Sequence, residues 1–333
     1  MTDQPAREID RTPFVRPDVA AFLTYLNSVP GPKMHELPPA EARAVMVAMK
    51  DVADLPRGEL AVVRDLAFSG PAGPLRARLF DARETRAPGP AVVFYHGGGW
   101  VIGDLDTYAS FAAEMARQLD LPVISVDYRL APEARWPAAP DDAEAATRWV
   151  ASAPEALGRG VTALVLAGDS AGGNLAIIVA AALRDRAAAV PVIVQAPIYP
   201  ATDASRPYPS FDAFADGYLL TRASMIWFNG HYGGDPTHPR FSPLLGDVAG
   251  LPRAVIVTAG LDPIRDQGRA YAAALAQAGV AVSFREAQGN IHGFITLRRA
   301  IPSSQGDVAG FLTAVRAAVT EAEGERVLRQ AAG

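Results

Sequence analysis

The amino-acid sequence predicts an α/β fold, in which helices cover both faces of a mostly parallel sheet. From about residue 60 onward, short apolar runs of strand length alternate with longer segments of helical periodicity. The apolar runs lie at residues 61–68, 75–80, 91–95, 123–126, 163–167, 192–196, 254–259 and 280–286. Helical patterns separate most of the later runs, at residues 108–119, 138–151, 173–187 and 266–278. Such alternation is typical of a parallel sheet that is buried on both faces.

Two segments stand outside this alternation. Residues 1–55 carry two amphipathic helical patterns, the second of which follows a pair of prolines. Residues 203–245 are dense in proline, glycine, aspartate and aromatic side chains around one helical segment, and we interpret them as an insertion. We therefore predict amino-terminal helices over 1–55, a core over 56–202 and 246–333, and an insertion over 203–245.

Composition and charge exclude several classes of function. The 333 residues include 31 Lys and Arg against 36 Asp and Glu, and no basic stripe suggests a nucleic-acid partner. The absence of cysteine excludes disulfides, thiolate metal sites and a cysteine nucleophile, so any covalent catalysis falls to serine. The charged amino terminus and the lack of an apolar run of about 18 residues predict a cytoplasmic location and no membrane partner.

The strongest functional signal is the segment Gly168-Asp169-Ser170-Ala171-Gly172. It lies between a strand-like run and a helical pattern, which is the context of a nucleophile elbow. Such an elbow needs small residues two places on either side of the serine, because its sharp turn brings backbone segments close together. We predict that Ser170 is a nucleophile at a helix amino terminus, where negative charge is stabilised. An ordinary Gly/Ser turn is the alternative.

A second signal is the segment His96-Gly97-Gly98-Gly99-Trp100, which follows the strand expected at 91–95. Consecutive glycines suit backbone N–H groups that stabilise the oxyanion of an acyl-transfer reaction. We predict Gly97, Gly98 and Ala171, the residue after the nucleophile, as the donors. One alternative is a phosphate-binding glycine turn, but the Gly-Lys-Ser/Thr sequence that usually completes such a turn is absent here. The other alternative is a plain flexible loop. His96 is expected to anchor the loop by hydrogen bonds rather than to act as a catalyst.

A serine nucleophile needs a base, and the order of groups in elbow enzymes is serine, acid, then histidine. Of the histidines after Ser170, His231 and His238 fall inside the insertion, whereas His292 follows the last strand-like run. We therefore predict that His292 is the general base. A histidine with a purely structural role is the alternative.

The acid should lie between the serine and the histidine, at the end of a strand. Asp262 follows the run at 254–259 and precedes Pro263, so we predict that it orients His292; a helix-capping turn is the alternative reading. Pro263 is suited to the first turn of the next helix, which would place Asp266 in or near that turn in a structural role.

Five segments, at residues 96–100, 127–133, 168–172, 262–266 and 291–294, resemble in content and order the bacterial hormone-sensitive lipase family of carboxylesterases. The matching branch is the one whose elbow reads Gly-Asp-Ser-Ala-Gly, and the resemblance covers nearly the whole chain. It implies an α/β-hydrolase fold with an eight-stranded sheet flanked by helices. It also implies a helical cap built from residues 1–55 and 203–245.

The resemblance further implies hydrolysis of short- to medium-chain carboxylic esters without cofactor or metal. The partner is then a small-molecule ester, and homodimers are frequent in the family. Arg129 and Glu133 resemble the family's structural pair near the catalytic loops. Residues Phe211 to Gly217 and Asn290 differ from the sequence that is more common in the family, which leaves cap contacts and substrate choice open.

Alternatives from two classes remain open at this point. An amidase, lactonase, thioesterase or carbohydrate deacetylase would use the same machinery, because an oxyanion hole does not recognise the leaving group. A non-catalytic ligand-binding module on the same fold would keep the pocket and could lose the histidine. The presence of Ser170, Asp262 and His292 together favours an enzyme.

Overall fold

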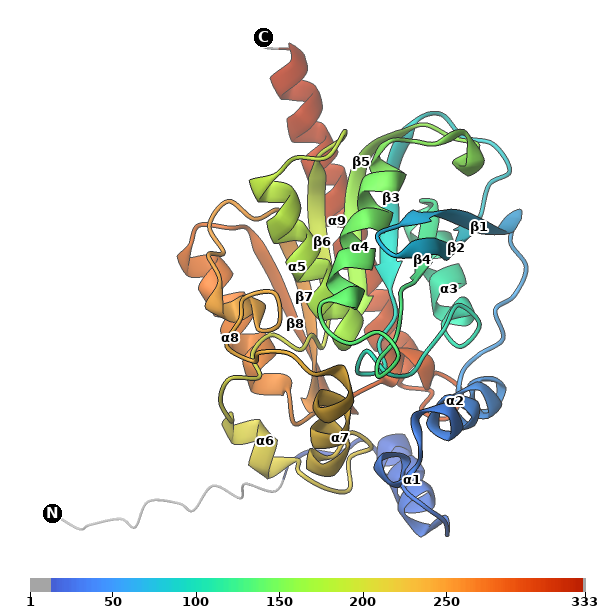
Figure 1. Ribbon diagram of the computed structural model, residues 1–333, viewed down its shortest axis with the longest axis vertical. Coiled ribbons are helices and arrows are strands. Elements are labelled where there is room, and N and C mark those ends of the chain that lie inside the picture. Colours follow the sequence, from blue (N-terminus) through green and yellow to red (C-terminus); the bar gives the residue numbers. More distant parts are fainter. Residues whose placement is uncertain (1–12, 332–333) are drawn as a thin grey trace, which may run out of the picture.

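The computed structural model describes residues 13–331, and its main feature is one eight-stranded sheet (Figure 1). The first twelve residues of the predicted amino-terminal segment lie outside the described residues. The strand order is β1-β2-β4-β3-β5-β6-β7-β8; β2 is antiparallel to β1 and β4, and the other neighbours are parallel. The predicted eight-stranded, mostly parallel sheet is thus confirmed. The strands are β1 (Val62–Gly70), β2 (Gly73–Asp81), β3 (Gly89–Tyr95), β4 (Val123–Asp127), β5 (Val161–Asp169), β6 (Val192–Ile198), β7 (Arg253–Leu261) and β8 (Val282–Ile291).

Helices cover both faces of this sheet. The side chains of α4, α5 and α8 pack in one apolar cluster against one face, and those of α3 and α9 pack in a second cluster against the other. Central strands such as β5 are buried on both sides, because alternate side chains enter the two clusters. These helices are α3 (Ala109–Leu119), α4 (Ala138–Ala151), α5 (Ala171–Asp185), α8 (Arg265–Gln277) and α9 (Ser304–Ala331).

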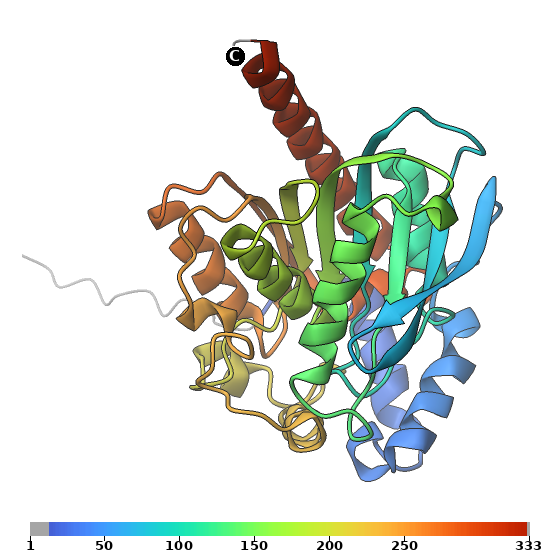
Figure 2. The same cartoon turned by 45° about the horizontal axis from the view of Figure 1, so that its top comes forward.

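The other α-helices of residues 13–331 gather at the end of the sheet where the parallel strands have their carboxyl ends (Figures 1 and 2). They come from the two segments that the sequence analysis set apart, and we call residues 13–55 and 203–245 the cap. The cap helices are α1 (Pro17–Ser28), α2 (Pro39–Ala53), α6 (Pro209–Ala213) and α7 (Arg222–Tyr232).

The carboxyl-terminal helix α9 is an element that the sequence analysis did not predict. Its 28 residues run along the sheet and continue past the end opposite the cap (Figure 1). Its buried residues include Val308, Phe311, Leu312 and Val315, which recur at helical spacing. No helix within residues 13–331 combines the length and the apolar character needed to cross a membrane.

Candidate active site

Ser170 lies at the sharp turn between β5 and α5, as predicted. Its backbone has φ 54° and ψ −116°, a strained conformation for a residue other than glycine. A Cβ atom on Gly172 would collide with the carbonyl oxygen of Tyr95, and one on Gly168 would collide with that of Gly172. The small residues on either side of Ser170 are therefore required by the close approach of three backbone segments.

The structure brings Ser170, His292 and Asp262 together from three strand ends. His292 Nε2 lies 2.9 Å from Ser170 Oγ, and His292 Nδ1 lies 2.7 Å from Asp262 Oδ2. Asp262 is fully buried, and its other oxygen accepts a hydrogen bond from the N–H of Ile264 at 2.9 Å. Because an ionised carboxylate only accepts, Nδ1 carries the proton of the neutral imidazole and Nε2 can accept the serine hydroxyl.

Asp266 lies four residues after Asp262 and has different partners. It stands in the first turn of α8, where its carboxylate accepts the N–H of Ser210 at 2.9 Å and pairs with Arg265. The predicted structural position of Asp266 is confirmed. Pro263, however, precedes the helix rather than belonging to its first turn, because α8 begins at Arg265.

The glycine loop after β3 differs in one respect from the sequence prediction. The N–H of Gly97 donates to Asp169 Oδ1 at 2.7 Å, so Gly97 is not free to act as the predicted oxyanion donor. The described residues that line the cavity beside Ser170 include Gly98, Gly99 and Ala171 but not Gly97. Gly98 and Gly99 have φ of 105° and 59°, a region that favours glycine. This loop geometry cannot be deduced from three consecutive glycines.

A cavity of about 1220 Å³ extends from Ser170 and His292 into the cap. Its lining is mainly apolar and comes from the core, from α1 and α2, and from residues 203–229. Sequence reasoning did not identify the cap residues of this cavity, because they come from two chain segments, 25–49 and 203–229, that are far apart in sequence. Among them are Leu26, Val45, Met46, Met49, Phe211, Met225 and Phe228.

A family model described as alpha/beta hydrolase fold matches residues 92–296 of this chain. The chain belongs to the alpha/beta hydrolase fold family. The resemblance to the bacterial hormone-sensitive lipase branch, inferred from five motifs, is thereby confirmed.

Two relatives illustrate what this alpha/beta hydrolase is similar to in sequence. It is 43% identical over 245 residues to the carboxylic ester hydrolase LipN of Mycobacterium tuberculosis, a match that covers 71% of this chain and 65% of LipN. The chain thus spans just under two thirds of that relative. It is 37% identical over 294 residues to the ethyl acetate hydrolase of Pseudomonas putida, which covers 85% of this chain and 92% of the relative.

The chain is also similar in fold to solved structures. An alpha/beta hydrolase enzyme from the metagenome of Lake Arreo, Spain, superimposes with a TM-score of 0.87 at 38% identity, covering 91% of this chain and 98% of the other. A thermostable esterase from Pseudomonas putida superimposes with a TM-score of 0.86 at 30% identity, covering 92% and 98%.

The expected pairing of Arg129 with Glu133 is wrong for this hydrolase. Arg129 instead pairs with the buried Asp142 of α4 at 2.7 Å. Glu133 pairs with Arg43 of α2 at 2.6 Å. Arg43 also donates to the backbone carbonyl of Val101, just beyond the glycine loop, so this ion pair connects the cap to the core.

His96 anchors the glycine loop of the hydrolase, as predicted. It is fully buried, its ring stacks on that of Tyr128 with centroids 4.4 Å apart, and its Nδ1 lies 2.7 Å from the carbonyl oxygen of Gly97. Because that oxygen only accepts, Nδ1 is the protonated nitrogen. Burial lowers the pKa of His96, which keeps the imidazole neutral.

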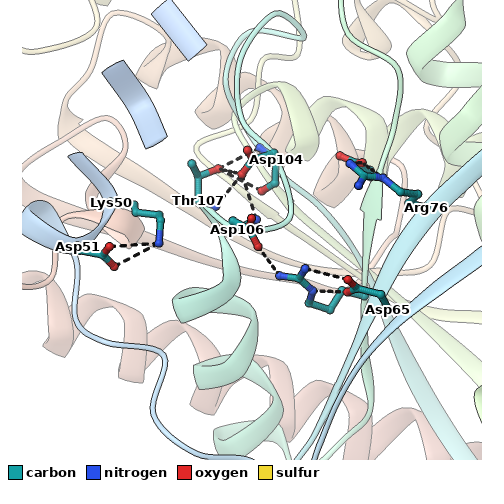
Figure 3. A network of polar contacts seen from close by, with 9 residues as sticks. Lys50, Asp51, Asp65, Arg76, Asp104, Asp106 and Thr107 are labelled. Atoms are coloured by element: carbon teal, nitrogen blue, oxygen red, sulfur yellow. Dashed lines mark hydrogen bonds and ion pairs between the residues drawn. The ribbon is translucent and has the colours of Figure 1, made fainter. Parts of the chain in front are cut away.

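A turn between the glycine loop and α3 fixes the start of that helix. Asp104 Oδ1 accepts the N–H groups of Asp106 and Thr107 and the hydroxyl of Thr107 (Figure 3). Arg78 of β2 pairs with Asp106 at 2.6 Å and also with Asp65. This network holds the residue that follows Thr107, Tyr108, at the start of α3.

Asp169 is a site residue whose role sequence reasoning missed. It directly precedes Ser170, and burial raises the pKa of its carboxyl to about 7. Its position inside the elbow motif was visible in the sequence, but its partners come from other strands and loops.

Within residues 13–331, no three carboxylate or imidazole side chains are grouped as metal ligands.

Proposed function

We propose that this protein is a serine carboxylesterase that hydrolyses short- to medium-chain carboxylic esters through an acyl-enzyme. The observation that carries the proposal is the continuous hydrogen-bonded chain from Ser170 through His292 to Asp262 at the wall of an apolar cavity. In this assignment Ser170 is the nucleophile, His292 the general base and Asp262 the group that orients the imidazole.

The reaction begins when Ser170 Oγ attacks the carbonyl carbon of the ester and His292 Nε2 takes the hydroxyl proton. The carbonyl oxygen becomes an oxyanion, which accepts hydrogen bonds from the N–H groups of Gly98, Gly99 and Ala171. Gly99 replaces Gly97 in this set because the Gly97 N–H is bound to Asp169. The amino terminus of α5 adds a favourable dipole at the same position.

Collapse of the tetrahedral intermediate breaks the bond to the alcohol, which leaves with the proton from His292. Water then attacks the acyl-enzyme, His292 takes a proton from that water, and the carboxylic acid departs as Ser170 recovers its proton. Asp262 stays ionised and stabilises the imidazolium in both halves of the cycle.

The competing functions differ in how well they fit these observations. A receptor-like binding module has no need of a complete hydrogen-bonded triad, so the geometry favours catalysis. An amidase, lactonase or deacetylase would use the same groups. The relatives named carboxylic ester hydrolase and ethyl acetate hydrolase support the ester assignment.

The cytoplasmic location and the homodimer stay predictions.

The proposal is tested with Ser170→Ala. We expect it to abolish covalent labelling by a fluorophosphonate probe and to lower ester turnover by several orders of magnitude, because the chain has no cysteine to replace the nucleophile. Ser205→Ala, at another serine that lines the cavity, is the control and should still be labelled. Labelling of the Ser170→Ala protein would contradict the assignment.

A further inference from the structure

The carboxylate of Asp169 joins three parts of the molecule at one point beside the nucleophile. Asp169 ends β5 and is only 2% exposed. Its Oδ1 accepts the N–H of Gly97 at 2.7 Å, and its Oδ2 accepts the hydroxyl groups of Tyr108 at 3.2 Å and Tyr199 at 3.3 Å. These partners come from the glycine loop, from the residue before α3 and from the residue after β6.

Two of these partners connect Asp169 to groups of the site. The hydrogen bond from Gly97 fixes the His96–Gly97 peptide, and with it the start of the segment that carries the N–H groups of Gly98 and Gly99. The space is tight, because a Cβ atom on Gly97 would collide with Asp169 and Tyr108. The ring of Tyr199 lies against that of His292, with centroids 4.5 Å apart.

We propose that Asp169 is a positioning residue for acyl transfer, whose ionised carboxylate holds the glycine loop and the Tyr199–His292 contact in their reactive arrangement. The inference rests on the proposed esterase function. Asp169 does not touch the reacting bond; it acts through Gly97 and Tyr199.

The buried position of Asp169 makes its ionised form energetically costly. Within the described residues, 13–331, no arginine or lysine forms an ion pair with it. The titratable groups around it are the phenols of Tyr108, Tyr128 and Tyr199 and the imidazole of His292. Burial raises the pKa of this carboxyl from 3.8 to about 7, so the folded protein keeps a proton that the unfolded chain has lost. Raising the pH from about 4 to about 7 therefore costs stability at this residue.

The ionised form is the one that serves catalysis. An anionic Asp169 accepts from Gly97 through a charge-assisted bond, and its negative charge favours the imidazolium that forms on His292. When the pH falls through about 7, the carboxyl becomes protonated and the loop is held less firmly. Protonation of Asp169 then contributes to the loss of activity in acid.

Two substitutions separate the roles of acceptor and charge. Asp169→Asn keeps an oxygen that can accept the Gly97 N–H but cannot ionise, whereas Asp169→Leu removes the acceptor. We expect Asp169→Leu to lower kcat by about 10²–10³-fold, as for loss of an oxyanion donor, with little change in KM. Asp169→Asn should lose about tenfold or less. Asp185→Asn, at the exposed far end of α5, is the matched control and should behave as the native protein.

The pH profile of kcat/KM is the second measurement, and a purely structural role would not change its shape. On the acid side, the native protein should lose up to about tenfold in kcat/KM as Asp169 becomes protonated, and this decrease should be absent from the Asp169→Asn profile, because the Asn side chain is neutral at every pH. The inference is overturned if the native and Asp169→Asn profiles have the same shape, or if a folded Asp169→Leu protein keeps native kcat. Should the Leu variant not fold, the Asn profile alone decides. Fluorophosphonate labelling of Ser170 in the Asn variant separates this outcome from a failure of the esterase proposal.

Discussion

Asp262 and Asp266 are identical side chains four residues apart, and their surroundings give them different roles. Asp262 is fully buried and faces His292. Asp266 is partly buried in the first turn of α8. Burial alone would raise the pKa of Asp266, but hydrogen bonds and charge from Arg265, with a smaller effect of Arg269, bring it below its usual value. The surroundings of each carboxylate, and not its residue type, determine whether it can orient the base.

This difference predicts opposite effects of the same substitution. Asp262→Asn should leave the protein folded and lower kcat by up to about 10⁴-fold, because an amide permits the wrong tautomer of His292. Asp266→Asn should mainly lower the free energy of unfolding by about 1 kcal/mol, because it weakens a helix amino terminus. Turnover and melting temperature of both variants are measured side by side. A catalytically inactive Asp266→Asn protein beside a nearly active Asp262→Asn protein would show that the triad is wrongly assigned.

At the residue scale, the motifs located the candidate site but could not specify every hydrogen bond in it. Ser170, Asp262 and His292 were found because their types and chain order are characteristic. The role of Gly97 was mistaken because the direction of an N–H depends on backbone angles and on the position of Asp169. The pairing of Arg129 was also mistaken. Its partner, Asp142, lies in a helix that the motif does not include.

At the scale of elements, the strands and most helices could be predicted because each has one periodicity over its whole length. The predicted run at 163–167, for example, lies within β5, and the pattern at 138–151 coincides with α4. The missed helix α9 carried a usable signal, because Val308, Phe311, Leu312 and Val315 recur at helical spacing. What no periodicity could show is how α2 is attached to the core.

That attachment depends on Arg43, and substitution should reveal it. Arg43 donates to the carbonyl oxygens of Val101 and Ala131, both at 2.8 Å, and pairs with the exposed Glu133. The exposed ion pair adds little, but the two carbonyls lose their charged donor in Arg43→Ala. We expect a loss of about 1–3 kcal/mol in the free energy of unfolding and a lower kcat/KM.

Lys50→Ala on the same helix provides the control for Arg43→Ala. Among residues 13–331, the exposed neighbour Asp51 is the one ion-pair partner of Lys50, so removal of Lys50 should change stability by less than about 0.5 kcal/mol. Chemical denaturation and ester kinetics of the two variants are compared. Equal effects of the two substitutions would mean that α2 is not held to the core through Arg43.

At the scale of the whole molecule, the cavity exists because separated parts of the chain converge at the carboxyl ends of the strands (Figure 2). Residues 25–49 and 203–229 supply the cap walls, and the core supplies Ser170 and His292. Its volume of about 1220 Å³ lies above the roughly 300–1,000 Å³ of common small-molecule sites. An apolar cavity of this size leaves room for an acyl chain longer than acetyl.

The cavity predicts how turnover depends on acyl length. In a series of p-nitrophenyl esters from acetate to octanoate, kcat/KM should rise with each methylene that becomes buried, by at most about 4-fold per step, since a buried methylene contributes about 0.8 kcal/mol. Met46 of α2 lines the cavity, and Met46→Trp should fill part of it and end the rise at a shorter chain. Val47 is 40% exposed and does not line the cavity, so Val47→Trp places the same indole on the outer side of α2 and should leave the series as in the native protein. Melting temperatures of both variants show whether the added ring disturbs folding. If the two tryptophan variants give the same dependence on chain length, the acyl chain does not lie against α2, and the cap wall formed by residues 203–229 is where it must be sought.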